Sequence, residues 1–395
     1  MTRLFTTEQI GENTLLLTAV SIFGQVVALR YDVAIVTEKK EENIFPIIKL
    51  SFVLAALISL VISIGYGISF YLDGEPTGAI AFKGFFLFVL LSLTGITNIL
   101  VSFNNRNKEY KLITKVHVKR NLAKECFMTV GGFLYPHTAV LILSQVVGTI
   151  FGVKEQSKSL LKKSDRLSAF KKVSFAQCVN MAKEHKKQAL FSTPAIFANN
   201  FSYSSINIFV ESLFGASTLG LYSISYRILG LPLGIVSNNI SKVYFEEAAR
   251  QYNTKGNYRG LFLKISALLL GVSIPFVAVL MVFAPMVCAL VFGQEYYAAG
   301  LYIRCLAPMF GIRLIVSPLT VGMQISRKQQ KELLIQLLFI LCSCLGYIAA
   351  KVLVFDMMSY LVLLSVAFSG VYLIYYAYLF KISKSNVCAE LSEDK

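Results

Sequence analysis

Long apolar stretches, repeated from one end of the sequence to the other, constrain the fold of this chain more than any other feature. Most are about 20 residues long, the length that a helix needs to cross a bilayer. The strands of a membrane barrel are shorter, at about 10 residues, and alternate between polar and apolar side chains. We therefore predict an all-α polytopic membrane protein with about eleven transmembrane helices. The predicted spans are residues 14–37, 45–72, 78–103, 110–134, 138–152, 189–213, 218–240, 261–283, 296–325, 333–354 and 358–380.

The placement of positive charge orients these spans. Only 15% of the residues are charged, against about 25% in a soluble domain, and the net charge is +16. Most Lys and Arg residues fall in alternate connections, with the largest groups at 102–124 and 152–188, whereas the other connections hold only Arg3. Basic loops stay on the cytoplasmic side. We therefore expect a cytoplasmic C-terminus. We also expect two spans within 110–152, joined at Tyr135–His137, because a single span would place 152–188 outside.

A short repeat indicates that the chain is built from two related halves. Leu4–Gly11 and Leu213–Gly220 share the pattern L-F-x4-[IL]-G, and each opens a run of five spans. A further span, 189–213, precedes the second copy only. We therefore expect that one helix is missing upstream of Met1 and that the complete protein has two parallel six-helix bundles. The predicted organisation is an N-terminal bundle at 1–152, a basic cytoplasmic linker at 153–188, a C-terminal six-helix bundle at 189–382 and a cytoplasmic tail at 383–395.

Arginines inside the apolar stretches are the strongest candidates for function. A charge at the bilayer centre costs about 2.5 to 3.5 kcal/mol on insertion scales, so it usually faces a protein interior or water. Arg30, Arg227 and Arg313 lie deepest, and we expect them to line a cationic cavity for a phosphate or an acidic sugar. Arg304 reaches the same cavity only if Pro308 bends its helix. The alternative is an ion pair between helices or a hydrogen bond to backbone.

Polar side chains also follow one face of the span at 189–213. Asn199, Tyr203 and Asn207 recur every fourth residue and therefore share a helix face. We expect that face to line the cavity and to hydrogen-bond sugar hydroxyls. The alternative is hydrogen-bonded packing between helices.

The sequence carries no sign of catalytic, nucleotide-binding or metal chemistry. Motifs such as HExxH, GxSxG, the Walker loop and GxGxxG do not occur. The seven cysteines have no metal-like spacing and are expected to be small buried side chains, and the three histidines, at 117, 137 and 185, are scattered. We therefore expect no enzyme activity, cofactor, metal or nucleic-acid partner. The basic segment 152–188 is interpreted as a topology signal that contacts membrane lipids.

Several short stretches, in order along the chain, resemble one family of membrane proteins. Arg30–Val36 resembles a stretch R-Y-E-x-A-I-V, and Asn105–Tyr110 resembles a loop N-R-x-K-x-Y. Gly220–Pro232, Phe292–Tyr296 and Arg304–Pro318 are similar to further helix regions of the same family. The resemblance is to the polysaccharide-transporter (Wzx-like O-antigen flippase) family of the MATE-related MOP exporter superfamily, and it covers nearly the whole chain.

The resemblance implies a fold of two helix bundles around a central cavity. It also implies a substrate, a lipid-linked oligosaccharide on undecaprenyl pyrophosphate, moved across the bacterial cytoplasmic (inner) membrane by alternating access for surface polysaccharide biosynthesis. Tyr31 lies in the same stretch as Arg30 and joins the expected substrate residues. Asp32 and Glu211 are the carboxylates within spans that could carry a coupling proton or sodium ion. Other polysaccharide-assembly proteins are expected partners.

Three alternatives stay open. A drug or cation antiporter of the same superfamily would favour carboxylates over arginines in its cavity. A membrane-embedded polysaccharide polymerase or ligase would generally carry a sizeable outside loop, whereas every outside loop predicted here is short. A non-functional fragment would follow from the missing helix.

The predicted topology can be tested at Ser164, in the middle of the basic segment 152–188. A reporter fused there should lie in the cytoplasm, because this segment holds the largest group of positive charges in the chain. An enzyme reporter that works only outside the cytoplasm should therefore stay inactive. Activity of that reporter at Ser164 would contradict the eleven-span topology.

Overall fold

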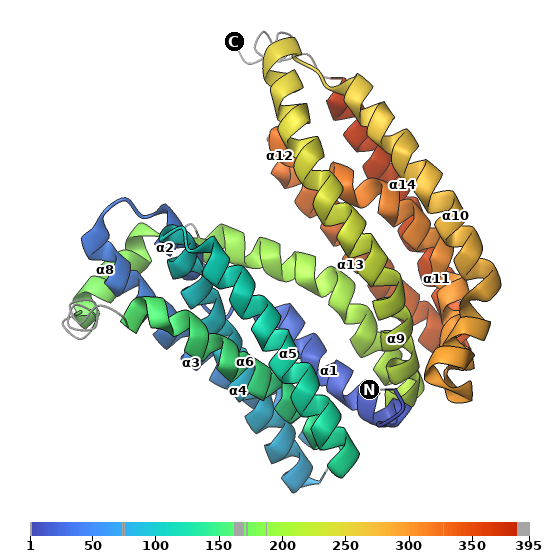
Figure 1. The fold of residues 1–395 in the computed structure, drawn as a ribbon, viewed down its shortest axis with the longest axis horizontal. Helices are drawn as coiled ribbons and strands as arrows, with labels where there is room; N and C mark the ends of the chain where they lie inside the picture. The colour runs from blue at the N-terminus through green and yellow to red at the C-terminus, as the bar shows by residue number, and fades with distance from the viewer. Residues whose placement is uncertain are drawn as a thin grey trace. The chain divides into compact units, whose positions relative to one another are not determined.

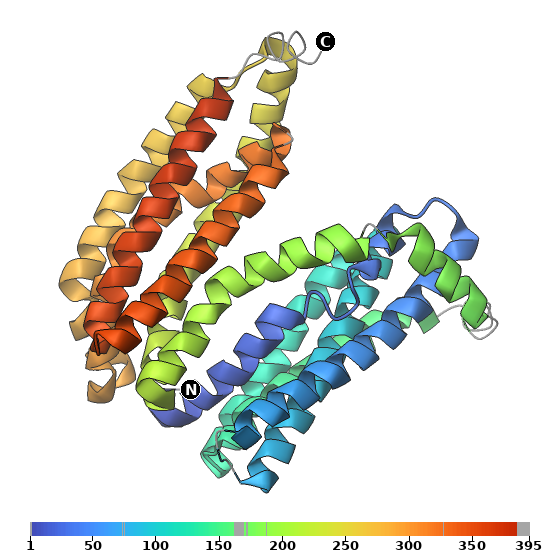
Figure 2. The ribbon, with the colours of Figure 1, turned by 180° about the vertical axis from the view of Figure 1, so that it is seen from behind.

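The computed structural model describes residues 2–72, 74, 76–161, 170, 173–186, 188–326 and 328–384. Every regular element within these residues is helical (Figures 1 and 2), which confirms the predicted all-α class. The chain divides into two compact units, Arg3–Ser204 and Ser205–Lys395, and the division falls inside one long helix. Ser164, the proposed reporter position, lies outside the described residues.

The first unit is a bundle in which helices that follow one another in sequence pack together. Its elements are α1 (Thr7–Phe23), α2 (Tyr31–Thr37), η1 (Glu41–Asn43), α3 (Ile44–Leu72), α4 (Thr77–Arg106), α5 (Tyr110–Leu134), α6 (Thr138–Leu161), α8 (Phe175–Glu184), η2 (Gln188–Ser192) and the beginning of α9 (Thr193–Lys255). α3 packs against α4 and α5 against α6 (Figure 1). Leu16 of α1 shares a buried cluster with Leu90 of α4 and Ile142 of α6, so α1 is held against both helices.

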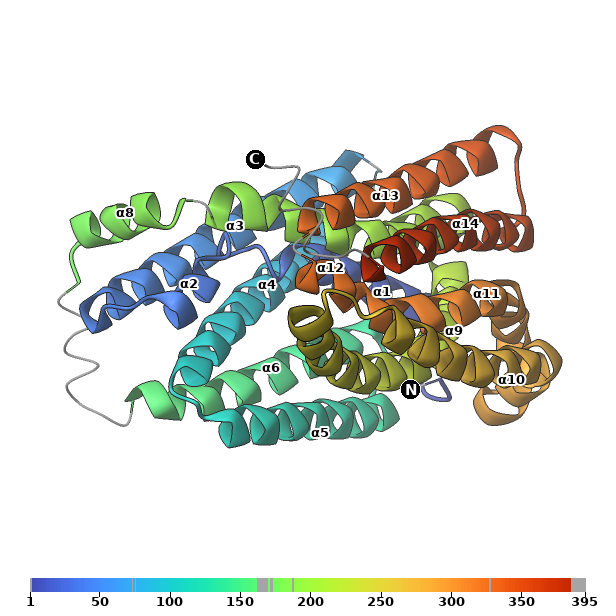
Figure 3. The ribbon, with the colours of Figure 1, turned by 90° about the horizontal axis from the view of Figure 1, so that it is seen from above.

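The second unit continues α9 and adds a second set of helices, drawn in yellow to red in Figure 3. Its further elements are α10 (Arg259–Phe292), η3 (Gln294–Tyr296), α11 (Tyr297–Val316), η4 (Ser317–Val321), α12 (Gly322–Ile325), α13 (Gln329–Val352) and α14 (Met357–Ser383). α11 packs on both α10 and α14, and α13 packs on α14. The rings of Phe339, Phe368 and Tyr372 form an aromatic cluster where α13 meets α14.

Eight helices among the described residues are long and apolar enough to cross a membrane. The longest, Gln188–Tyr252, carries two of the predicted spans. They are separated at Gly215, whose φ of 81° and ψ of 172° are not helical and suit a residue without a side chain. α5 has the predicted bounds 110–134 but carries too many basic residues to be counted among the eight.

The structure differs from the sequence prediction at the first span, 14–37, which is not one continuous helix. α1 starts earlier, at Thr7, with a capping box formed by Thr6 and Gln9, and it ends at Phe23. The chain then turns through residues 24–30 before α2 begins. The carbonyl of Gly24, left free by this break, accepts a hydrogen bond of 2.9 Å from the Asn98 amide of α4. A partner on another helix therefore stabilises the interruption.

The predicted span 296–325 is also divided, into α11, η4 and α12, with the change of helix type at Ser317–Pro318. Near its start, α11 lies very close to α10. A Cβ added to Gly300 would stand 2.3 Å from the Cα of Pro285 and 2.7 Å from the carbonyl oxygen of Ala284. Only glycine permits this approach of the two backbones.

Replacing Gly300 by alanine should therefore destabilise the second unit. The atoms that the new methyl group meets belong to backbone, which cannot rotate away, and overpacking of this kind costs about 1 to 3 kcal/mol. Thermal unfolding of the purified protein in detergent measures the effect. Gly271→Ala on α10 is the matched control, because a Cβ there meets nothing within 4 Å. Equal stability of the two variants would contradict the close contact.

Candidate functional site

Arg30 lies at the break between α1 and α2 and has an unusual backbone. Its φ of 61° is left-handed, as is the φ of 46° at Leu29. This conformation costs a residue with a side chain roughly 1 to 2 kcal/mol, and such residues cluster at functional sites. The guanidinium is partly buried, and its Nε has no hydrogen-bond partner among the described residues. Arg30 therefore retains an unused donor beside a non-helical turn.

Asp32, in the first turn of α2, lies within the electrostatic reach of Arg30. Arg30 precedes α2 as its N-cap residue, so the spacing of side chains along a helix does not separate it from Asp32. Asp32 is 5% exposed, and its Oδ1 has no hydrogen-bond partner in the described part of the chain. The pair thus places one cation and one buried carboxylate at the same break.

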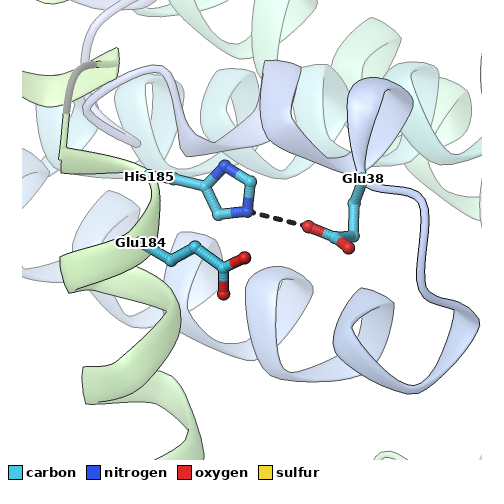
Figure 4. A group of neighbouring side chains, drawn as sticks. All are labelled: Glu38, Glu184 and His185. Atoms are coloured by element: carbon cyan, nitrogen blue, oxygen red, sulfur yellow. Dashed lines mark hydrogen bonds and ion pairs between the residues drawn. The ribbon is translucent and has the colours of Figure 1, made fainter.

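α8 contacts both ends of α2. The buried Tyr31 hydroxyl donates a 3.0 Å hydrogen bond to the carbonyl of Ala182, and Glu38, which caps the other end of α2, lies 3.0 Å from the His185 ring (Figure 4). Lys49 of α3 donates to the carbonyl of Val173, just before α8, at 2.7 Å. Tyr31 therefore orients α2. The segment 153–188, predicted to be a linker, contains α8, which packs on the first unit.

The Glu38 carboxylate is buried and fully engaged. Its Oε1 accepts from the backbone N–H of Lys40 at 2.9 Å and from the Asn43 amide at 3.4 Å, while its Oε2 faces the His185 Nε2. The Lys40 N–H above all, followed by the His185 and Asn43 bonds, holds the pKa of Glu38 below its ordinary value. Arg106 donates to the Glu38 carbonyl and pairs with the Glu41 carboxylate at 2.8 Å.

In the second unit, Arg313 lies among aromatic rings. Its Nη1 donates a 2.8 Å hydrogen bond to the Tyr226 hydroxyl, and its guanidinium stands 5.5 Å from the ring of Phe310 and 6.0 Å from that of Tyr226. The two rings meet edge to face at 5.3 Å. A guanidinium supported in this way is suited in charge and shape to a phosphate or carboxylate. The sequence prediction did not single out Tyr226, although it stands next to Arg227.

Arg304 and Arg313 have different partners although they share α11. Arg304 donates from Nη2 to the carbonyl of Val282 at 2.9 Å, near Pro285 of α10. It thus makes the hydrogen bond to backbone that the sequence offered as the alternative to a cavity position. α11 continues as a helix through the exposed Pro308.

The remaining predicted residues lie on α9. Arg227 is exposed and takes part in a further interaction. The predicted polar face consists of Asn199, Tyr203 and Asn207, and the second candidate carboxylate is Glu211. All four are partly exposed and precede the break at Gly215. Arg30 belongs to the first unit, and Arg227, Arg304 and Arg313 belong to the second.

Two grooves of the second unit are apolar. One, of about 480 Å³, is lined by α10, α11 and α14 and includes Leu263, Ile312 and Tyr376. The other, of about 240 Å³, includes Phe283 and Ile303. None of the predicted polar or charged residues lines either groove, so both suit hydrocarbon and not sugar.

Comparison with known proteins agrees with this architecture. The sequence model of a family described as "Polysaccharide biosynthesis protein" matches residues 1–301. No curated protein matches the chain significantly.

Solved structures similar to this one are MATE transporters. An inward-facing multidrug resistance MATE family transporter of the MOP superfamily is 14% identical, with a TM-score of 0.71, over 97% of this chain and 94% of the other. A MATE protein in complex with MaL6 is 14% identical, with a TM-score of 0.57, over 95% and 94%. These likenesses show the fold. Together, fold and family support a multi-pass membrane protein that acts in transport. The chain belongs to the polysaccharide biosynthesis protein family and has the fold of the MOP superfamily transporters.

Proposed function

We propose that this protein is a flippase that moves a lipid-linked oligosaccharide, an O-antigen or capsule repeat unit on undecaprenyl pyrophosphate, across the cytoplasmic membrane. Membership of the polysaccharide biosynthesis family supports a substrate that contains an oligosaccharide. The MATE fold supports movement across the membrane by alternating access. The observation that carries the proposal is the guanidinium of Arg313, which bonds to the Tyr226 hydroxyl and lies against the Phe310 ring.

This arrangement fits both parts of the substrate. A guanidinium pairs with phosphate oxygens through two parallel hydrogen bonds, which a lysine cannot do. The Tyr226 hydroxyl, which accepts from Arg313, can donate its own O–H to a sugar oxygen. The polar face of α9, with Asn199, Tyr203 and Asn207, would add hydrogen bonds to sugar hydroxyls.

In the first unit, we assign Arg30 and Asp32 to the substrate and to the coupling ion. The partly exposed guanidinium of Arg30 would bind the anionic part of the substrate, and Asp32 would exchange a proton or sodium ion as transport proceeds. Glu211 is the second carboxylate we propose for coupling. We place the protein in the inner membrane with its C-terminus in the cytoplasm, because of the positive charge in its connections.

The rival function is a drug or cation antiporter, since the structures with this fold include a multidrug resistance transporter. An organic cation requires carboxylates or unoccupied aromatic faces. In the second unit, the aromatic pair is already covered by Arg313, which would repel such a cation. This electrostatic conflict favours an anionic substrate.

Arg30→Ala and Arg227→Ala, each in the full-length protein, should abolish surface polysaccharide without lowering protein abundance. Each substitution removes a cation that we assign to the substrate. The measurement is restoration of surface glycan in a strain that lacks its own flippase, with the amount of protein in the membrane quantified in parallel. Arg250→Ala is the control, because Arg250 is exposed and pairs with Glu247 three residues before it. Normal glycan in both test variants would contradict the proposal.

Arg313→Lys should reduce flipping at least tenfold, and Tyr226→Phe should reduce it less. Lysine keeps the charge but loses the paired donors, whereas the Tyr226 change removes one hydrogen bond and keeps the ring. The assay is movement of a fluorescent lipid-linked oligosaccharide in vesicles containing the purified protein. Arg259→Lys is the matched control, because Arg259 stacks at 5.4 Å over Phe380 outside the proposed site. An Arg313→Lys variant as active as Arg259→Lys would overturn the role of Arg313.

A further inference from the structure

Three possible metal ligands meet where α8 reaches the end of α2. Glu38 caps α2, and Glu184 and His185 stand at the end of α8 (Figure 4). One ligand atom from each of the three lies within 4.8 Å of the others. The residues come from positions about 150 apart in the chain, so the fold and not the local sequence assembles them.

The donor set is a nitrogen and two carboxylate oxygens. Imidazole together with carboxylate suits Zn²⁺ and similar transition metals, whereas Mg²⁺ and Ca²⁺ prefer oxygen alone. Two ligands of a tetrahedral zinc ion, each about 2.0 to 2.1 Å from the metal, lie roughly 3.3 Å apart. The Glu38 Oε2 and the His185 Nε2 are 3.0 Å apart, so small movements would admit an ion between them.

The buried member of the group is already oriented. Glu38 is only 9% exposed. The Lys40 N–H and the Asn43 amide both bond its Oε1, which fixes the carboxylate and directs its Oε2 toward His185. Carboxylates that bind metal are held by such outer hydrogen bonds, and losing these bonds typically weakens the metal site 10- to 100-fold.

Two carboxylates give this group the negative charge that a divalent cation requires. They stand at the C-terminal ends of two helices, where the carbonyls add negative partial charge. One neighbouring cation, Arg106, is engaged by other groups: it donates to the carbonyls of Ile35 and Glu38 and pairs with the Glu41 carboxylate.

We propose that Glu38, Glu184 and His185 bind a divalent transition-metal ion of the zinc class, which fastens α8 to α2. Water completes the tetrahedral shell. The ion would add a strong cross-link to the contacts that already hold α8, the Tyr31 bond to Ala182 among them.

Zinc titration of the purified full-length protein tests this site. After treatment with a chelator, the protein in detergent is titrated with Zn²⁺ in a calorimeter. We expect one ion per chain, and affinity at least tenfold weaker in Glu184→Gln and in His185→Ala. His117→Ala is the matched control, because His117 is exposed on α5 and belongs to no such group in the described part of the chain. Equal binding by all variants, or the absence of saturable binding, would overturn the proposal.

Glu184→Gln also separates a metal site from a simple ion pair. The dashed contact of Figure 4 joins only Glu38 and His185, so this variant keeps the contact while removing one metal ligand. Zinc should slow amide hydrogen exchange in residues 175–185 of the wild type and have no such effect in Glu184→Gln. Zinc-dependent protection in both proteins would show that Glu184 is not a ligand and would refute the site. Glycan transport is measured separately, so failure here leaves the proposed flippase untouched.

Discussion

Backbone hydrogen bonding is the constraint on which the rest of this structure depends. A hydrocarbon interior offers no water to an unpaired N–H or C=O group, so each interruption of a helix needs a partner from elsewhere. The carbonyl of Gly24 receives one from Asn98. Arg304 also bonds to backbone, at the carbonyl of Val282 in α10. Some of the polar residues in the apolar stretches therefore serve as hydrogen-bond partners for backbone carbonyls of neighbouring helices. A charged residue in such a stretch does not by itself indicate a substrate site.

The helices were largely predictable, because length and apolar composition decide which segments can cross a membrane. Charge placement also divided 110–152 at the position where the structure has α5 and α6. The break at residues 24–30 was not predictable from the local sequence. It contains no proline, and the amide that stabilises it, from Asn98, lies 74 residues further along the chain. A signal of that kind exists only once the helices have packed.

The candidate site shows the same limit. Sequence alone identified the arginines but could not distinguish them, since each is a cation in an apolar stretch. Their surroundings in the structure distinguish them. Arg313 lies against aromatic rings, Arg304 binds a backbone carbonyl, and Arg30 has a left-handed backbone conformation. His185 gave no pattern at all, because its partner Glu38 is 147 residues away. Chemistry assembled from distant residues requires the fold before it can be recognised.

The docking of α8 limits how far the next helix can travel. A polypeptide extends by at most about 3.3 to 3.6 Å per residue, and only the residues from His185 to Lys187 separate the end of α8 from the start of η2. While α8 stays on α2 and α3, the first turn of η2 must remain within roughly 14 Å of Glu184 by the same measure. The short connection therefore restricts the start of η2 as long as α8 stays bound. A large displacement of α9 must begin beyond its first turns or follow the detachment of α8.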